Sequence, residues 1–192
     1  MKPAEPTPVK FFCGVLYSDA AKLQQARDVM QQKFGPVQWT SLPFPFDMTD
    51  YYEPEMGGPI YRLFFSFEKL INPKALAQIK IDCNAVEDHL AVDGRRKVNL
   101  DPGYMDYDKV VLASAKYAGH KVYLDFGIYA DTTMTYRKGR FYPSEWCFPD
   151  FKSGGYEEAF LHIRAQYKGQ LRKMKKFADS SRFHPSSQVA RK

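Results

Sequence analysis

The chain has 192 residues and a mass of 22.2 kDa, and it carries 28 Lys and Arg residues against 22 Asp and Glu residues. A hydrophobic content of 44% excludes a globally disordered protein, and the length favours a single domain. The net charge of +6 favours anionic partners, such as nucleic acids, membrane surfaces or small anions.

The N-terminus is rich in proline and lacks the apolar stretch of a signal peptide. No apolar run approaches the roughly 20 residues that a transmembrane helix needs. The three cysteines, Cys13, Cys83 and Cys147, are widely spaced and form no CxxC pair, which disfavours a disulfide framework or a zinc ribbon. We therefore expect a cytoplasmic protein with reduced thiols and no membrane partner.

The first half of the chain alternates between strand and helix patterns. Runs rich in β-branched and aromatic residues indicate strands, and apolar residues at spacings of three and four indicate helices. After an extended segment at 1–8, the predicted elements are a strand at 9–17, a helix at 19–34, a strand at 37–41, a loop at 42–59, a strand at 60–67, a helix at 72–92 and a strand at 97–100. This β-α-β-β-α-β order predicts a ferredoxin-like core within an α+β domain.

The second half predicts an antiparallel β-meander followed by a C-terminal helix. Short glycine-containing turns separate four β-rich runs, at 109–116, 121–126, 128–137 and 140–142. Apolar residues at helical spacing predict a helix at 155–177, which closes a single domain over 9–177. The remaining segment, 178–192, has low hydrophobicity and no period, so we expect a disordered basic tail.

The positive charge is concentrated at the C-terminal end. From Lys152 onward there are ten Lys and Arg residues against three Asp and Glu residues, whereas residues 1–151 hold 18 and 19. Five cations crowd the end of the predicted last helix, between Lys168 and Lys176. They favour nucleic-acid contact through this helix, although cations at a helix C-terminus also complement the helix dipole.

An acidic loop at 47–58 is the first candidate for a functional segment. It places Asp50, Glu53 and Glu55 beside Tyr51 and Tyr52, with no basic residue in the loop. Nearby carboxylates repel one another unless a cation lies among them, and their oxygens are the ligands that Mg²⁺ prefers. The alternative is a solvated acidic loop without a ligand.

The second candidate segment is DGRRKVNLDPGY at 93–104. It carries Arg95 ahead of a short strand, and Asn99 and Asp101 at the strand's end. Asp before Pro-Gly favours a type II turn at 101–103, so these side chains serve either the turn or a ligand.

Polar residues also share faces of the predicted strands. Arg62, Ser66 and Glu68 lie on the same face as Phe64, which we expect to be a solvent face or the wall of a ligand cleft. Lys116 ends a meander strand, and His120 follows a turn. The sequence contains no GxxxxGK[ST], GxGxxG, GxSxG or HExxH motif, which disfavours the common nucleotide-binding folds, hydrolases and zinc proteases.

Several motifs resemble an uncharacterised prokaryotic family, domain of unknown function 4416. The resemblance spans most of the chain, and its most recognisable element is NLDPG; WCFPDF at 146–151 departs conservatively from the family pattern. The motifs that carry it are PFDMTDYYEPEMG at 45–57, SFEKLI at 66–71, VNLDPGY at 98–104, VLASAK at 111–116, HKVYLDFGIYA at 120–130 and YRKGRF at 136–141. The resemblance implies no established activity. Some members are labelled GTP-binding, but the phosphate-cradling loop and lysine of such GTPases are absent here.

The leading hypothesis is a protein that binds a small anionic ligand, such as a nucleotide or another phosphate, with Mg²⁺ as a candidate cofactor. Phosphoester or phosphoanhydride hydrolysis is the candidate reaction, because cation clamps and carboxylate-held Mg²⁺ suit phosphoryl chemistry. We assign catalysis to Asp101 and His120, ligand binding to Arg62, Arg95, Asn99, Lys116 and Tyr52, and metal binding to Asp50, Glu53 and Glu55.

Two hypotheses of other classes stay open. One is an RNA- or nucleic-acid-binding module that uses sheet tyrosines, such as Tyr123 and Tyr129, together with the basic C-terminal helix. The other is a non-catalytic structural or interaction protein, in which the motifs serve packing and turns. The oligomeric state is left open.

Overall fold

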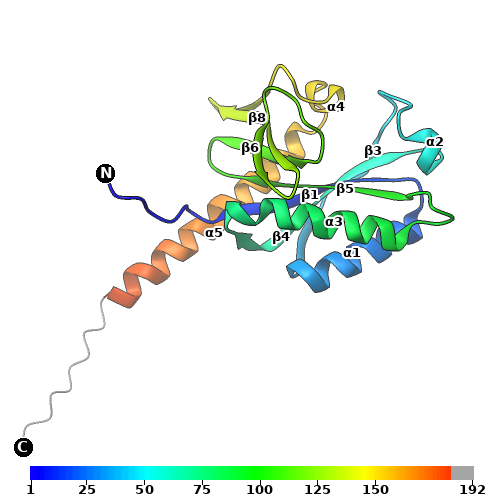
Figure 1. Cartoon of the computed structure of the whole chain (residues 1–192). Coiled ribbons are helices and arrows are strands. Elements are labelled where there is room, and N and C mark those ends of the chain that lie inside the picture. Colours follow the sequence, from blue (N-terminus) through cyan, green and yellow to red (C-terminus); the bar gives the residue numbers. More distant parts are fainter. Residues whose placement is uncertain (183–192) are drawn as a thin grey trace, which may run out of the picture.

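Nine strands form one antiparallel sheet with helices on both of its faces (Figure 1). The computed structural model describes residues 1–182, of which 178–182 are placed as helical backbone. The elements are β1 (Val9–Tyr17), α1 (Ala20–Phe34), β2 (Val37–Thr40), β3 (Phe44–Pro45), α2 (Glu53–Met56), β4 (Tyr61–Ile71), the 3₁₀ turn η1 (Pro73–Ala75), α3 (Leu76–Leu90), β5 (Val98–Met105), β6 (Lys109–Ser114), β7 (Val122–Asp125), β8 (Ile128–Arg137), β9 (Arg140–Pro143), α4 (Pro149–Lys152) and α5 (Glu157–Arg182).

The predicted α+β class and the C-terminal helix are confirmed, and the strands of the second half are antiparallel as expected, with β8 pairing with β6, β7 and β9. The main path of the sheet is β2-β4-β1-β5-β6-β8-β7, while β3 pairs with β4 and β9 with β8. The ferredoxin-like description of the first half stays a prediction. A side-chain cap marks the start of α1: the Asp19 carboxylate accepts hydrogen bonds from the amides of Ala21 and Lys22 at 2.8 and 3.0 Å.

Strand β1 carries the core on both of its faces. Phe11 and Cys13 belong to the cluster under α1 and α3, whereas Phe12 belongs to the cluster under α5. This two-sided burial explains why the segment reads as a continuous apolar run rather than as an alternating strand. The sheet is therefore the middle layer between two helical layers.

The expected turn at 101–103 is wrong, because β5 continues through it to Met105. Pro102 and Gly103 pair with Cys13 and Phe12 of β1. Pairing with β6 begins only at Gly103, so Pro102 lies beyond the part of the ladder that β6 shares, where a missing N–H is tolerated. The side chain of Asp101 is consequently held by a strand and not by a flexible turn.

Other boundaries also differ from the sequence prediction, and β4 continues to Ile71, four residues beyond its expected end. The loop at 42–59 contains the short elements β3 and α2, and the segment after β9 contains α4. Helix α5 continues to Arg182, beyond its expected end at 177 and into the segment expected to be disordered. The rest of that predicted tail, 183–192, lies outside the described residues.

Among the described residues, none of the helices combines the length and the apolar character needed to cross a membrane.

Gly103 lies where strands β1, β5 and β6 are packed most tightly. A Cβ there would stand 2.6 Å from the carbonyl oxygen of Val111 and 2.7 Å from the ring of Phe12. We expect Gly103→Ala to lower the free energy of unfolding by about 2 kcal/mol or more, because backbone cannot yield as a flexible side chain does. Urea denaturation measures the change. Gly119→Ala is the matched control, since nothing lies within 4 Å of that position, and an equal loss in both variants would contradict the packing argument.

Candidate functional site

A cavity of about 310 Å³ opens between the loop that precedes α2, the strands β4 and β5, and the start of α4. Aromatic rings form much of its wall, and four charged side chains reach it. Its lining residues are Phe46, Met48, Thr49, Tyr51, Tyr52, Arg62, Asp101, Lys116, Phe148, Pro149 and Asp150. Segments distant in the sequence therefore converge on one place.

Arg62 is the buried cation of this cavity, with only 4% of its surface exposed. Its Nη1 lies 3.4 Å from an oxygen of Asp101, and its Nε lies 3.0 Å from an oxygen of Asp150. The rings of Phe46 and Phe151 lie 5.2 and 5.6 Å from the guanidinium carbon. Burial alone would lower the pKa of Arg62, but the two carboxylates raise it above its ordinary value, so the side chain stays charged.

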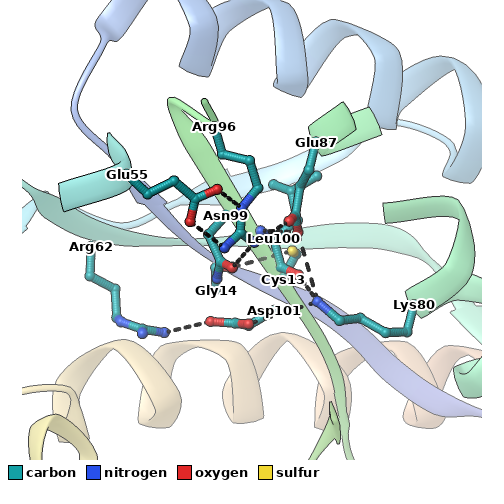
Figure 2. A network of polar contacts seen from close by, with 10 residues as sticks. All are labelled: Cys13, Gly14, Glu55, Arg62, Lys80, Glu87, Arg96, Asn99, Leu100 and Asp101. Atoms are coloured by element: carbon teal, nitrogen blue, oxygen red, sulfur yellow. Dashed lines mark hydrogen bonds and ion pairs between the residues drawn. The ribbon is translucent and has the colours of Figure 1, made fainter. Parts of the chain in front are cut away.

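Gly14 makes the contact between Arg62 and Asp101 possible. It lies on β1, between Phe64 of β4 and Asp101 of β5. A Cβ at this position would stand 3.1 Å from Nη1 of Arg62. The bare backbone of Gly14 thus leaves the space through which the guanidinium crosses β1 to reach β5 (Figure 2).

Asp101 also faces a second cation, Lys80 of α3, at 4.0 Å (Figure 2). The Lys80 ammonium donates a hydrogen bond to the carbonyl oxygen of Leu100 at 2.7 Å and lies 3.7 Å from Glu87. Burial alone would lower the pKa of Lys80, but Asp101 and Glu87 raise it. Asp101 keeps 24% of its side chain exposed, more than Arg62, Lys80 or Glu87, so it is the acidic group of this network that a ligand can reach.

Arg96 connects this network to the acidic loop. Its guanidinium donates to both oxygens of Glu55, at 2.6 and 2.7 Å, to Glu87 at 2.7 Å and to the Asn99 amide oxygen at 2.9 Å. Lys97 donates to the carbonyl oxygen of Met56 at 3.0 Å. These bonds fix α2 against β5 and so position the loop that forms one wall of the cavity (Figure 2).

Lys116 stands at the edge of the cavity. Its ammonium lies 3.1 Å from the Tyr51 hydroxyl and 4.6 Å from the centre of that ring. Lys116 is exposed, and within the described part of the chain no carboxylate lies within ion-pair distance of it. Beside it, burial raises the pKa of the Tyr52 phenol to about 12, so this hydroxyl stays protonated and can donate a hydrogen bond.

Four of the residues predicted from the sequence meet in this cavity, namely Tyr52, Arg62, Asp101 and Lys116. The others lie elsewhere. Asp50 and Glu53 line a separate surface hollow, Glu55 and Asn99 are bonded to Arg96, and Arg95 pairs with Val92 in an isolated bridge. No group of three or more His, Cys, Asp or Glu residues in the described structure is arranged to hold a metal ion, and the metal assignment stays a prediction.

His120 belongs to a neighbouring cluster and does not line the cavity. Its Nε2 lies 3.5 Å from an oxygen of the buried Asp131, and its ring stacks on Trp146. Lys121 lies 3.2 Å from the other oxygen of Asp131 and 6.0 Å from the ring centre of Phe148, which is shared with the cavity wall. The structure thus separates the two residues to which catalysis was assigned.

The face of β4 that carries Arg62 and Ser66 was expected to contact solvent or to line a ligand cleft. The structure contradicts this expectation for Ser66. Ser66 is fully buried beneath α5, where its hydroxyl donates to Gln166 at 2.6 Å. Only the Arg62 end of that face opens into the cavity.

The sequence analysis missed five residues of the site: Gly14, Lys80, Glu87, Arg96 and Asp150. Lys80 and Glu87 carried a signal, since both fall on the apolar face of α3 beside Ile79, Cys83 and Val86. A charged residue on such a face needs a buried partner. Gly14 gave no signal, because a glycine within an apolar strand does not reveal what passes over it.

Comparisons with known proteins place the chain in a family without giving an activity. The family model described as domain of unknown function (DUF4416) matches residues 7–167. No curated protein and no solved structure matches the chain.

Asp150 neutralises a buried cation, so its loss is expected to be costly. We expect Asp150→Ala to lower the free energy of unfolding by about 3–5 kcal/mol, because Arg62 keeps only its longer contact to Asp101. Chemical denaturation measures the loss. Asp88→Ala, at an exposed position of α3, serves as the control. A loss below about 1 kcal/mol in Asp150→Ala would show that Arg62 is solvated and not held by the pair.

The Glu55–Arg96 pair predicts a pH dependence. The hydrogen bonds from Arg96 lower the pKa of Glu55 in the folded protein below its value in the unfolded chain. The pair therefore stabilises the fold above the unfolded pKa, and this stabilisation is lost as the pH falls through the lower folded pKa. We expect the stability difference between the wild type and Glu55→Gln to be constant near neutral pH and to shrink in acid. Glu53→Gln, which removes an exposed carboxylate from the same short helix and leaves the Glu55–Arg96 pair in place, is the control, and an equal trend in both variants would contradict the assignment to this pair.

Proposed function

The chain belongs to the DUF4416 family, a domain of unknown function, and on that premise we propose that its cavity binds a small anionic ligand of the nucleotide class. The observation that carries the proposal is the pairing of an aromatic-walled cavity with Lys116 at its edge, an exposed cation that has no carboxylate partner among the described residues. A volume of about 310 Å³ suits one compact ligand better than a dinucleotide.

The charges of the cavity favour a ligand with a neutral body and an anionic end. Deep in the cavity, Asp101 and Asp150 balance Arg62, so no positive charge is left there for an anion. At the edge, Lys116 attracts a phosphate or carboxylate. Tyr51 and Phe148 offer ring faces to a planar group, and the exposed carboxylate of Asp101 accepts hydrogen bonds from its N–H groups.

The proposal is restricted to binding. Hydrolysis requires a base and a stabiliser of the developing charge close to the reacting atom, and His120 lies outside the cavity. Mg²⁺ is not needed to balance Asp101 and Asp150, since Arg62 lies 3.4 Å from one oxygen of Asp101 and 3.0 Å from one oxygen of Asp150. Binding through Lys116 needs neither a metal ion nor a reaction.

A thermal-shift and calorimetry panel tests the proposal. The probes are nucleoside monophosphates, the corresponding nucleosides and inorganic phosphate, each with and without Mg²⁺. We expect at least one monophosphate to raise Tm by several degrees at saturation, without a requirement for Mg²⁺. Lys116→Ala should weaken monophosphate binding by about tenfold and leave nucleoside binding almost unchanged, since only the phosphate contact is lost.

Lys33→Ala is the matched control, because it removes one exposed lysine from α1. Absence of any shift in the wild type contradicts the nucleotide assignment. Equal weakening by Lys116→Ala and Lys33→Ala would show that net charge is responsible and that the cavity is not the site.

A further inference from the structure

We propose that the second half of α5 binds the phosphate backbone of nucleic-acid duplexes, independently of their sequence and at a site separate from the cavity. The first half of α5 packs against the sheet through Phe160, Ile163, Tyr167 and Leu171. After Leu171 every described side chain up to Phe177 is exposed, and this part of the helix projects away from the body (Figure 1).

The projecting part of α5 carries four cations between Arg172 and Lys176, and the next acidic residue in the sequence is Asp179. Residues 159–178 contain six Lys and Arg residues and no Asp or Glu. Within the described part of the chain, Lys168, Arg172, Lys173 and Lys175 make no ion pair. With six cations and no acidic residue, the segment 159–178 contributes +6, a charge equal to the net charge of the whole chain.

The cations follow the helix as a stripe. Arg164, Lys168, Arg172 and Lys176 recur every four residues, which is about 6 Å along the axis, and Lys175 lies beside them. At 100° per residue these side chains fall within a sector of about 120°. Arg164 is held by the carbonyl oxygen of Tyr107 and the ring of Tyr136. Like charges at this spacing repel one another by about 0.2–0.5 kcal/mol per pair, and a polyanion along the stripe would relieve the repulsion between Lys168 and Arg172.

The helix dipole does not account for this stripe. Cations complement the dipole only within the last turn, and α5 ends at Arg182. Lys168, Arg172, Lys173 and Lys175 all lie before that turn. If α5 ended at residue 177, the cations near that end would lie in its last turn and would complement the helix dipole. Because α5 continues to Arg182, the dipole does not explain them.

A nucleic-acid backbone fits the stripe better than a membrane does. The apolar side of the first half of α5 is occupied by the sheet, and Leu171 and Met174 face the groove formed with Pro6–Val9. Among the described side chains of the projecting half, only Met174 and Phe177, at 46% and 73% exposure, offer apolar surface to a bilayer. A rigid row of evenly spaced cations suits a polyanion with evenly spaced charges. The sheet tyrosines Tyr123 and Tyr129 lie on β7 and β8, away from the projecting half of α5, so they do not extend this surface (Figure 1).

The test compares two variants of equal net charge. The stripe variant replaces Lys168, Arg172, Lys173 and Lys175 with Gln, which preserves helix propensity. The control variant replaces the exposed residues Lys33, Lys69, Lys74 and Lys138 with Gln. Fluorescence anisotropy measures binding of the full chain to labelled DNA and RNA duplexes of about 20 base pairs and of unrelated sequences, over a salt series starting near 50 mM.

We expect the wild type to bind all duplexes with a steep salt dependence. The stripe variant should lose about tenfold or more in affinity at low salt, and its salt slope should fall by about 3 to 4, because each lost contact to a duplex phosphate removes about 0.9. The control variant should stay within about twofold of the wild type. Equal losses in both variants, no binding by the wild type, or tighter binding to phosphatidylserine vesicles than to duplexes would each overturn the proposal. The cavity variant Lys116→Ala should bind duplexes normally, which separates this test from that of the small ligand.

Discussion

The buried guanidinium of Arg62 has to be neutralised within the protein, and this requirement organises the site. A charge that is 4% exposed is stable only with close partners, and it has two, Asp101 on β5 and Asp150 on α4. Each partner comes from a different part of the chain. The ion pairs therefore fix α4 and β5 relative to β4, and the space between these elements is the cavity.

The same need for charge neutralisation applies to the charged residues of α3 and β5 that surround Asp101. Asp101 faces Lys80, Lys80 faces Glu87, Glu87 binds Arg96, and Arg96 binds Glu55 in the acidic loop. Signs alternate along this chain of contacts, so no member is left as an isolated buried charge. The acidic loop, whose carboxylates suggested a metal, is anchored by an arginine at Glu55. What the network leaves accessible within the cavity is part of the Asp101 carboxylate.

Sequence patterns predicted those parts of the structure that are determined by residues close together in the chain. The cap at Asp19, the proline start at Asn72 and the helical faces of α1 and α3 all follow from residues within one or two turns of each other. Sequence patterns also placed Tyr52, Arg62, Asp101 and Lys116 among the ligand-binding and catalytic residues, because polar groups at strand ends and in loops are often functional. The turn at Asp101 was wrong because tertiary pairing with β1 outweighed the turn propensity of Asp-Pro-Gly.

Local sequence rules could not identify the residues that Arg62 and Asp101 contact. Nothing near Arg62 in the sequence points to Asp150, which is 88 positions away, and nothing near Asp101 points to Gly14. Such pairs form when strands align, so only the sheet register reveals them. By contrast, Lys80 and Glu87 lie on the apolar face of α3. Charged residues in such a position indicate buried ionic partners, so this pattern supports a prediction from the sequence alone.

The charge is unevenly distributed between the body and the projecting half of α5, and this reflects whether the cations are buried or exposed. In the body, the buried cations Arg62 and Lys80 are held by carboxylates, so the electrostatic field they produce outside is small. In the projecting half of α5, the described side chains from Arg172 to Phe177 are exposed, and Arg172, Lys173 and Lys175 make no ion pair within the described residues, so their field extends into solvent to about a Debye length. The family model matches residues 7–167 and so ends where this half begins. The net charge of +6 therefore describes the C-terminal helix rather than the cavity, where Asp101 and Asp150 balance Arg62.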